Sequence, residues 1–220
     1  MSGGKLTALQ WRILQLLSDL QPPWTLTGGA ALAGVYLKHR TTRDLDLFWH
    51  DRDRLGSLVD EARDRLTGAG LEVSSLQAGG TFSRLRVEKG GEVCLVDFVA
   101  DPVPALERPH RIEIEGASII VDTLHEILVN KLCALLGRAE IRDLVDVRAL
   151  LDAGADLKRA LGDAPRKDGG FSPLVLAWVL RDLRPEALAP VSDLTEEQAA
   201  ELARFRDRLV LDLLEAGAPL

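Results

Sequence analysis

An α+β fold is predicted for this chain, with a mixed β-sheet and flanking helices followed by a helical C-terminal half. Short segments of the strand type, rich in alternating apolar and polar residues, recur up to about residue 121. From residue 122 onward the apolar residues follow helical spacing instead. The two patterns do not alternate regularly, which favours α+β over a repeating βαβ chain. We therefore expect two domains, residues 1–121 and residues 122–220.

The composition is that of an ordinary globular protein. The chain has 220 residues, of which 46% are hydrophobic and 28% are charged. No apolar run approaches the roughly 20 residues of a membrane span, so we expect no membrane partner. The net charge of −7 argues against general adsorption to nucleic acid, which needs a basic face. That charge leaves room for one local basic pocket.

The N-terminal segment and the cysteines indicate a cytoplasmic protein. The stretch MSGGKLTALQWRILQLL has the pattern of an amphipathic helix rather than of a signal peptide. The two cysteines, Cys94 and Cys133, stand far apart in apolar settings. We expect free thiols in a reducing compartment rather than a disulfide.

Hydrophobic periodicity and turn residues locate the elements of the first half. Helices are expected over residues 5–20, 30–38 and 55–66, and the first of them ends at the sequence QPP. Gly90 and Gly91 are expected to form the turn of a hairpin. Strands are expected over residues 24–27, 42–49, 71–77, 81–89, 92–100, 111–116 and 117–121.

The second half is expected to contain four helices. They cover residues 123–138, about 140–152, 172–183 and the segment after Thr195. Two of them begin with capping boxes, Thr123 with Glu126 and Thr195 with Gln198. The segment GDAPRKDGG, residues 162–170, is expected to be a loop because of its glycines and proline.

The stretch TTRDLDLFWH contains two aspartates, Asp44 and Asp46, in an expected strand. Residues two apart in a strand share a face, so both carboxylates should project side by side. Like charges this close repel, and burying them unpaired costs several kcal/mol by order of magnitude. This arrangement requires a cation nearby.

The sequence before the aspartates supplies a setting for a nucleotide. A short strand leads into Gly28 and Gly29 and then into a helix, whose free N–H groups can face an anion. Mg²⁺ fits between such a phosphate cradle and the carboxylates, because it takes oxygen ligands from both. A third carboxylate is expected on a neighbouring strand, and Asp97 stands in an otherwise apolar strand.

Each of these parts has an ordinary alternative. A Gly-Gly pair before a helix is usually a turn, and a lone D-x-D is usually a surface feature or a cap. An acid in a strand, such as Asp97, can lie at a sheet edge and pair with a nearby arginine. The order and spacing of the three parts together favour a metal–nucleotide site.

These motifs resemble those of a known family. The pattern G-G-x-x-L followed by H-R-[ST]-x-x-D-L-D-L-F is similar to the nucleotidyltransferase fold of the DNA polymerase β superfamily. The segments K-L-x-A-L-x-x-R and R-D-x-x-D resemble, more narrowly, the AbiEii-type nucleotidyltransferase toxins of type IV toxin–antitoxin systems. The resemblance runs from about Trp24 to Leu151, and more loosely through SPLVLAWVLRDL.

The resemblance implies an enzyme and its partners. A member of this family would transfer a nucleoside monophosphate from an NTP to a hydroxyl group, with Mg²⁺ (or Mn²⁺) as cofactor. The implied acceptor is a tRNA 3′ end or a protein, and the implied partner is an antitoxin. The resemblance also implies a nucleotidyltransferase-like sheet in residues 1–121 and a helical domain, residues 122–220, that completes the cleft.

Lys131 has two readings. It falls inside the apolar stripe of the helix TLHEILVNKLCALLGR, which Arg138 extends. Such a lysine can bury its stem and reach water, or it can point into a cleft that holds triphosphate. Asp143 and Asp146 share a face of the next helix and could pair with Arg138 and Arg142, and on a surface such pairs contribute little. The resemblance implies that Lys131 binds phosphates and that Asp143 or Asp146 orients the lysine or the acceptor.

The expected site can then be stated by role. Asp44, Asp46 and Asp97 hold metal, with Asp97 as third ligand or as base for the acceptor hydroxyl; if Asp97 faces away, Asp143 is the candidate base. Thr42 stands where the family often has serine. The expected nucleotide-binding residues are Gly28, Gly29, Arg40, Thr42, Lys131, Arg138 and Asp146.

Three other functions are compatible with parts of the sequence. One is transfer to a small-molecule acceptor, as in antibiotic-modifying enzymes. Another is a nucleotidyltransferase fold kept as a binding module without turnover, against which the intact Asp44, Asp46 and Lys131 argue. A glycosyltransferase that uses D-x-D is the last, and it lacks the preceding glycine pair. The four histidines lack zinc-ligand spacing.

Overall fold

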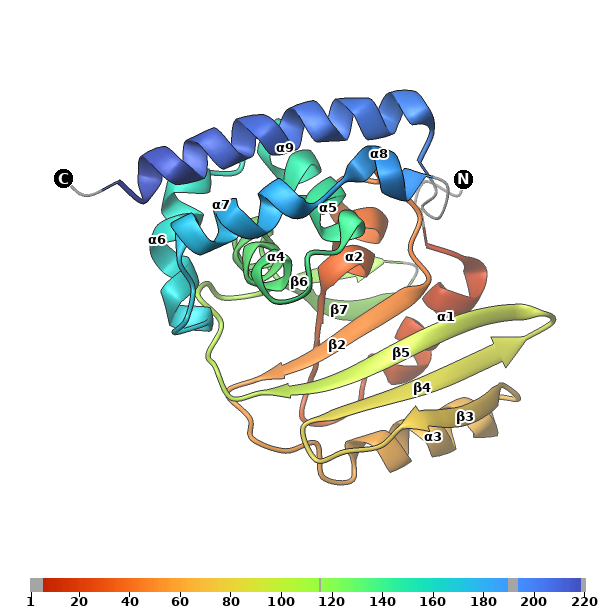
Figure 1. The fold of residues 1–220 in the computed structure, drawn as a ribbon. Helices are drawn as coiled ribbons and strands as arrows, with labels where there is room; N and C mark the ends of the chain where they lie inside the picture. The colour runs from red at the N-terminus through yellow and green to blue at the C-terminus, as the bar shows by residue number, and fades with distance from the viewer. Residues whose placement is uncertain (1–5, 115, 190–193, 219–220) are drawn as a thin grey trace. The chain divides into compact units, whose positions relative to one another are not determined.

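The structure, a computed structural model, describes residues 6–114, 116–189 and 194–218. The chain divides into two compact units, the first ending at Thr123 and the second beginning at Leu124. The first unit contains a β-sheet and helices, and the second contains helices in its described residues (Figure 1). The α+β class predicted from the sequence is therefore confirmed.

The described residues of the first unit form one seven-stranded sheet in the order β3-β4-β5-β2-β1-β7-β6. β2 pairs in parallel with β5, and β1 with β7, whereas the other neighbours are antiparallel. The sheet is thus mixed, as expected. Its strands are β1 Thr25–Thr27, β2 Asp44–His50, β3 Glu72–Gln77, β4 Phe82–Lys89, β5 Glu92–Asp101, β6 His110–Ile114 and β7 Ala117–Val121.

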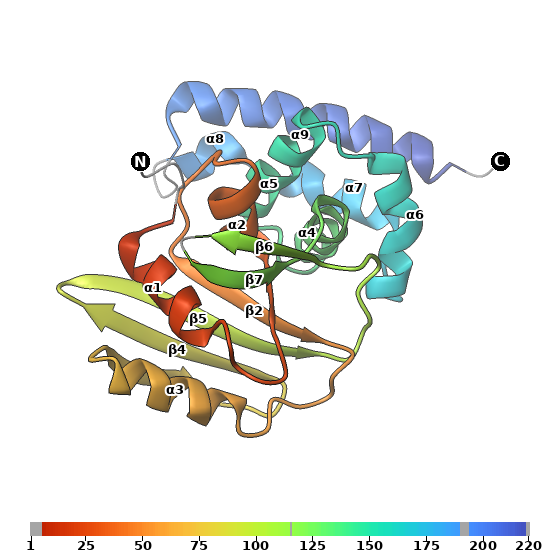
Figure 2. The same cartoon turned by 180° about the vertical axis from the view of Figure 1, so that it is seen from behind.

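One face of this sheet forms the apolar core of the unit. Along β2 the alternate residues Leu45, Leu47 and Trp49 are buried, and the residues between them are half-buried. Trp49 stacks on Phe98 of β5, with ring centroids 6.0 Å apart. Helices α1 (Ala8–Leu17) and α3 (Leu58–Gly68) lie side by side over this part of the sheet (Figure 2). The opposite face of β2 therefore carries its acidic residues.

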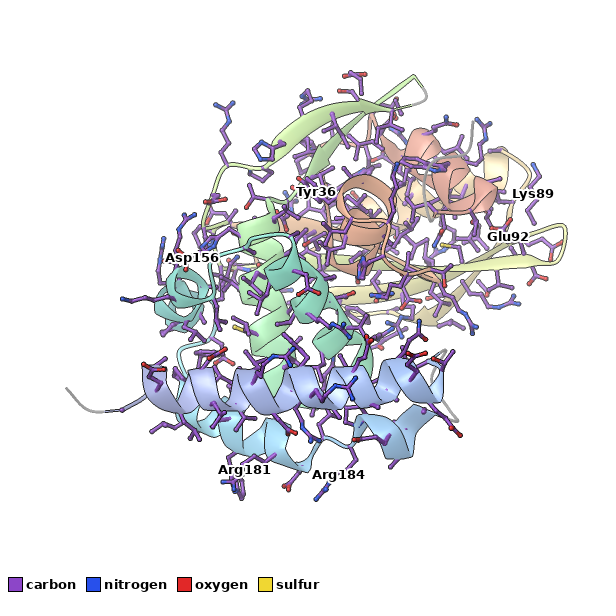
Figure 3. The ribbon with its side chains drawn as sticks, turned by 90° about the horizontal axis from the view of Figure 1, so that it is seen from above. Tyr36, Lys89, Glu92, Asp156, Arg181 and Arg184 are labelled. Atoms are coloured by element: carbon purple, nitrogen blue, oxygen red, sulfur yellow. The ribbon has the colours of Figure 1, made fainter. Side chains whose placement is uncertain are left out.

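The predicted hairpin between β4 and β5 is confirmed. Gly90 and Gly91 form its turn, both with positive φ, and Lys89 pairs with Glu92 at the end of the ladder. Figure 3 labels this last pair of residues. A two-residue turn fixes the pairing of every residue further down the hairpin.

The glycine-rich helix follows β1 directly, with no residue between Thr27 and Gly28. Helix α2 (Gly28–Ala31) continues without interruption into the π-helical turn η1 (Leu32–Tyr36). Ala30 to Ala33 are buried, which fixes this helix against the unit. The predicted strand–glycine–helix arrangement is therefore present, with the helix starting at Gly28 itself.

The second unit contains helices at each of the four places predicted, and two more among its described residues. The four are α4 Leu124–Arg138, α5 Ile141–Asp152, α7 Pro173–Asp182 and α9 Glu196–Ala216. The capping box of Thr195 and Gln198 is confirmed. The helix α8 (Pro185–Leu188) was not predicted.

The loop predicted for residues 162–170 was wrong, because helix α6 runs from Leu157 to Lys167. Asp156 caps this helix, its side chain accepting a hydrogen bond from the Arg159 amide at 2.9 Å. Ala160, Leu161 and Ala164 are buried on one face. This packing outweighs the weak helix propensity of Gly162, and Pro165 is tolerated close to the helix end.

Cys94 and Cys133 are free cysteines, as expected. Burial raises the pKa of Cys94 to about 12 and that of Cys133 to about 11, so both thiols stay protonated near neutral pH. None of the helices in the described part of the chain has the length and apolar character that a bilayer crossing requires.

Candidate active site

Asp44 and Asp46 lie on the polar face of β2, as the sequence predicted. Leu45 between them is fully buried on the other face, and both aspartates are half-buried. The alternation of the strand thus brings the two carboxylates to one face.

The glycine pair lies against this face. Gly28 has a φ of +62°, and a Cβ atom built on it would stand 2.3 Å from an Asp46 carboxylate oxygen. A Cβ on Gly29 would stand 2.5 Å from the Arg40 guanidinium and 3.4 Å from Thr42 Oγ1. A side chain at either position would displace charged or polar groups. The structure therefore brings Gly28, Gly29, Arg40, Thr42 and Asp46 together.

Helix α1 helps to position the segment that precedes β2. The side-chain amide of Gln10 donates to the Thr42 carbonyl oxygen at 3.0 Å, and Gln10 is buried. Arg40 donates to the Thr41 carbonyl oxygen at 2.9 Å. This segment is thereby fixed beside the glycine turn.

Asp97 lies level with Asp46 on the neighbouring strand. The two are register partners in the parallel ladder of β2 and β5, so their side chains share a face about 4.8 Å apart in backbone position. The expected adjacency of these strands is confirmed, and Asp97 points neither into the apolar core nor to the far face.

Both oxygens of Asp97 are bound by Arg84 of β4. Arg84 Nε and Nη2 each donate to one carboxylate oxygen of Asp97 at 2.6 Å. The alternative reading of Asp97 as the partner of an arginine is therefore observed, although β5 lies inside the sheet rather than at its edge. Sequence reasoning missed Arg84.

Arg84 supplies positive charge to the whole acidic group. Its hydrogen bonds to Asp97 raise the pKa of Arg84, and burial, which opposes charge, is outweighed. The charges of Asp44 and Asp46 raise that pKa further. Across the described residues, no three or more His, Cys, Asp or Glu side chains are already arranged to hold a metal ion. In this structure both oxygens of Asp97, the third carboxylate, are thus hydrogen-bonded to the Arg84 guanidinium.

Thr27 is a second residue that sequence reasoning missed. It precedes Gly28, pairs in register with Asp46 and is 3% exposed. Its hydroxyl oxygen is buried and has no hydrogen-bond partner among the described residues. An unsatisfied buried hydroxyl costs about 1–3 kcal/mol, so this one requires an explanation. Its position in the same row as Asp46, Asp97 and Arg84 places it at the candidate site.

The second unit contains a buried ionic network. Lys131 Nζ lies 2.7 Å from an Asp143 oxygen and 2.8 Å from an Asp146 oxygen, and both aspartates are fully buried. Arg138 donates two further hydrogen bonds to Asp143, at 2.8 and 3.0 Å. Lys131 therefore does not reach water in the way the snorkelling alternative supposed. Asp146 is buried, so a surface pair is wrong for it, whereas the expected pairing of Arg138 with Asp143 is present.

The network favours the charged forms of Lys131 and Asp143. Burial alone would lower the pKa of Lys131, but the charges of Asp146 and Asp143 outweigh it and raise that pKa. Burial likewise opposes ionisation of Asp143, but the Arg138 hydrogen bonds and the Lys131 charge lower its pKa. The break at Ala139, which has a φ of 48°, separates α4 from α5 and allows Arg138 to approach Asp143.

The geometry defines a class of protein. A mixed sheet that presents D-x-D beside a glycine turn, with a third acid on the adjacent parallel strand, is a nucleotidyltransferase-like fold. The family model described as the nucleotidyl transferase AbiEii toxin of type IV toxin–antitoxin systems matches residues 12–216. The chain belongs to this family, which confirms the resemblance and extends it to nearly the whole sequence.

Solved structures agree on the fold. JHP933 from Helicobacter pylori is 22% identical, with 94% of this chain and 91% of that chain covered and a TM-score of 0.55. A candidate nucleotidyltransferase from H. pylori is 20% identical, with 96% of each chain covered and a TM-score of 0.53. At such identities the likeness concerns the fold alone. No curated protein shows significant similarity to the chain.

Replacing Lys131 by methionine should destabilise the protein. The change keeps the apolar stem but leaves the Asp143 and Asp146 carboxylates buried without Lys131. The expected loss is about 3–5 kcal/mol in the free energy of unfolding, measured by denaturant titration. Lys158→Met, at an exposed lysine of α6, is the matched control and should change little. Equal stability of the two variants would contradict a structural role for the Lys131 pairs.

Replacing Thr27 by valine should separate stability from ligand binding. Removing an unsatisfied buried hydroxyl while keeping the side-chain shape should raise the free energy of unfolding by about 1 kcal/mol. If the hydroxyl serves a ligand, affinity for metal-bound NTP should fall in the same variant. Thr67→Val, at an exposed threonine of α3, is the control. Lower stability with unchanged affinity would show that Thr27 has a structural partner instead.

Proposed function

We propose that the chain is a Mg²⁺-dependent nucleotidyltransferase (Mn²⁺ being the alternative metal) that transfers a nucleoside monophosphate from an NTP to an acceptor hydroxyl. Family membership supports nucleotidyl transfer in general. The observation that carries the finer proposal is the row Thr27, Asp46, Asp97 and Arg84 across neighbouring strands, with Gly28 against Asp46. This row offers acidic groups and an open backbone turn at one place.

The residues present fit a divalent metal bound together with a nucleotide. Mg²⁺ in nucleotide sites is usually held by one or two protein carboxylates plus substrate phosphates, and Asp44 and Asp46 supply the former. Because Gly28 has no side chain, the Asp46 carboxylate lies directly against the backbone of the glycine turn, where a Cβ atom would collide with it. When bound, the metal ion would neutralise the acids and stabilise charge on the reacting phosphoryl group.

The chain's own groups would orient the substrate. The backbone at Gly28 and Gly29, the Thr42 hydroxyl and the Arg40 guanidinium lie around one turn and would contact the phosphates. The orphan hydroxyl of Thr27 would gain its missing partner there. Catalysis of this type consists mainly of positioning and charge neutralisation.

Arg84 would control the third carboxylate. While Arg84 binds both oxygens of Asp97, that carboxylate cannot serve as metal ligand or as base for the acceptor hydroxyl. We expect Arg84 to release at least one oxygen when metal and nucleotide bind, and its guanidinium could then contact phosphate.

Lys131 would bind phosphate from a fixed position. An ammonium group has three donors, and Asp143 and Asp146 account for two of them. We propose that the third donates to a phosphate, and Arg138 restrains Asp143 in turn. Under this proposal the two aspartates orient the lysine, as the resemblance implied, and Arg138 acts through Asp143.

The acceptor and the biological role belong to the same proposal. Family membership favours a toxin of a type IV system, with an antitoxin encoded as its counterpart and a tRNA 3′ end or a protein hydroxyl as acceptor. A small-molecule acceptor is the alternative. One observation favours a binding module without turnover, namely the ion pair that occupies Asp97. Measuring whether a labelled acceptor and pyrophosphate are formed distinguishes transfer to a macromolecule, transfer to a small molecule and binding without turnover.

Incubation with each labelled NTP, Mg²⁺ and either total tRNA or cell lysate should label one class of acceptor and release pyrophosphate. Asp44→Asn and Asp46→Asn should each abolish labelling, because they remove a metal-binding carboxylate, while the melting temperature holds or rises as like-charge repulsion is relieved. Asp53→Asn, at an exposed aspartate beyond β2, is the matched control. Full labelling by the Asp46→Asn variant would contradict the role of Asp46 as a metal ligand. Bound NTP without release of pyrophosphate would favour a binding module without turnover.

Arg84→Gln tests the competition for Asp97 without measuring catalysis. If Arg84 and metal compete, the variant should bind Mn²⁺ several-fold more tightly, followed by electron paramagnetic resonance, although it should be less stable without metal. Arg86→Gln, two residues along the same strand and paired with Glu88, measures the general effect of losing one positive charge. The same Mn²⁺ affinity in both variants would show that Arg84 is purely structural.

A further inference from the structure

A pocket lies at the C-terminal end of β2, away from Asp44 and Asp46. Its volume is about 470 Å³, and its lining includes Pro22, Pro23, Arg52, Arg108, Arg111 and Ile120. His50, the last residue of β2, also lines it. Along a strand each residue advances about 3.3 Å, so His50 lies about 13 Å from Asp46. This pocket, entirely within the first unit, is therefore separate from the carboxylate row.

The three arginines of the pocket lack acidic partners within the described residues. Arg52 Nε donates to the Arg54 carbonyl oxygen at 2.8 Å, and Arg111 donates to Ser118 Oγ at 3.0 Å. Neither of these acceptors carries a charge, and no carboxylate of the described chain pairs with Arg108. Two arginines outside the pocket are neutralised, since Arg65 pairs with two acids and Arg148 with two more.

The acids near the pocket do not neutralise this charge. Asp101 and Asp122 contact the two ring nitrogens of His50, at 3.3 and 3.1 Å. Asp51 is the one acidic residue in the described lining, and it is exposed. A chain with a net charge of −7 thus gathers three unneutralised guanidinium groups around one cavity. Their mutual repulsion is relieved when an anion binds.

The chemistry of the lining selects among anions. The fork of a guanidinium matches the paired oxygens of phosphate, and several such forks around one cavity suit a phosphate group. Pro22, Pro23 and Ile120 add apolar wall, which an inorganic ion would not use. The volume lies within the range of about 300–1,000 Å³ that is usual for organic ligands.

We propose that this pocket binds a phosphate-bearing organic ligand of nucleotide size, either a free nucleotide or one unit of a single-stranded nucleic acid. The two sources share the same chemistry, a phosphate held by Arg52, Arg108 and Arg111 with an organic body against the proline wall. The pocket does not contain Asp44, Asp46 or Asp97. The proposal therefore stands independently of nucleotidyl transfer.

Fluorescence anisotropy of the full chain in EDTA tests the proposal, because EDTA suppresses metal-dependent binding of NTP at the carboxylate row. The two ligands are a labelled mononucleotide and a labelled ten-nucleotide single-stranded RNA, with inorganic phosphate as competitor. The double variant Arg108→Gln, Arg111→Gln should weaken binding of whichever ligand binds by about tenfold or more. Both arginines are exposed, so folding should survive, as checked by circular dichroism.

The matched control removes the same charge elsewhere. Arg181→Gln with Arg184→Gln changes two exposed arginines of the second unit, labelled in Figure 3, and should leave the affinity within about twofold. Ala105→Trp fills the cavity without changing charge and should also weaken binding. Binding of the mononucleotide supports a free nucleotide, and binding of the RNA alone supports a strand.

Three outcomes would overturn the proposal. The first is that neither ligand binds the wild-type chain in EDTA. The second is equal weakening by the two double variants, which would indicate general charge attraction. The third is unchanged affinity in Ala105→Trp, which would place any binding outside the cavity.

Discussion

The ion pair between Arg84 and Asp97 is the interaction on which the acidic face of the sheet depends. Three carboxylates stand on one face of adjacent strands, and two of them, Asp46 and Asp97, are register partners. Without a nearby cation such an arrangement would favour separation of β2 and β5. Arg84 supplies that cation from β4, bidentately and in line with both acids. The sheet can therefore fold with its acidic row complete before any metal is present.

The second unit also contains carboxylates that lie close together and are stabilised by nearby cations. There two aspartates with no exposure enclose one lysine, and an arginine at the end of α4 completes the charge balance. Each charged group has hydrogen-bonding partners, which is the condition under which a buried ionic cluster is tolerated. Such a cluster fixes the direction of its lysine far better than a solvent-exposed pair would.

Much of the fold and part of the candidate site could be predicted from sequence, for identifiable reasons. Alternation along β2 predicted that Asp44 and Asp46 share one face. The Gly28-Gly29 pair predicted the turn before the helix that lies beside them. Arg84 was also within reach, because counting back from the Gly90-Gly91 turn sets residue 84 opposite residue 97. The local pattern around Asp97, an acid in an apolar strand, does not by itself identify this partner.

Other features could not be obtained from local pattern. The burial of Asp143 and Asp146 depends on how α4 and α5 pack, which no periodicity reveals, so a surface pairing remained open. The unsatisfied hydroxyl of Thr27 can be seen only in three dimensions, where no group of the described chain lies within hydrogen-bonding reach of it. The helix α6 was missed because Gly162 and Pro165 suggested a loop, whereas its buried face and its Asp156 cap determine the outcome.

The two-residue turn at Gly90 and Gly91 has a consequence for how this protein can vary. Side chains alternate along β4, so a change at the turn that shifted the pairing by one residue would reverse every side chain of one strand relative to the other. Ser83 or Leu85 would then face Asp97, and the acidic row would lose its counter-charge. A change that shifted the pairing by two residues, or one that only enlarged the loop, would preserve the facing. Changes at this distant tip are therefore constrained to those that keep the pairing of Lys89 with Glu92.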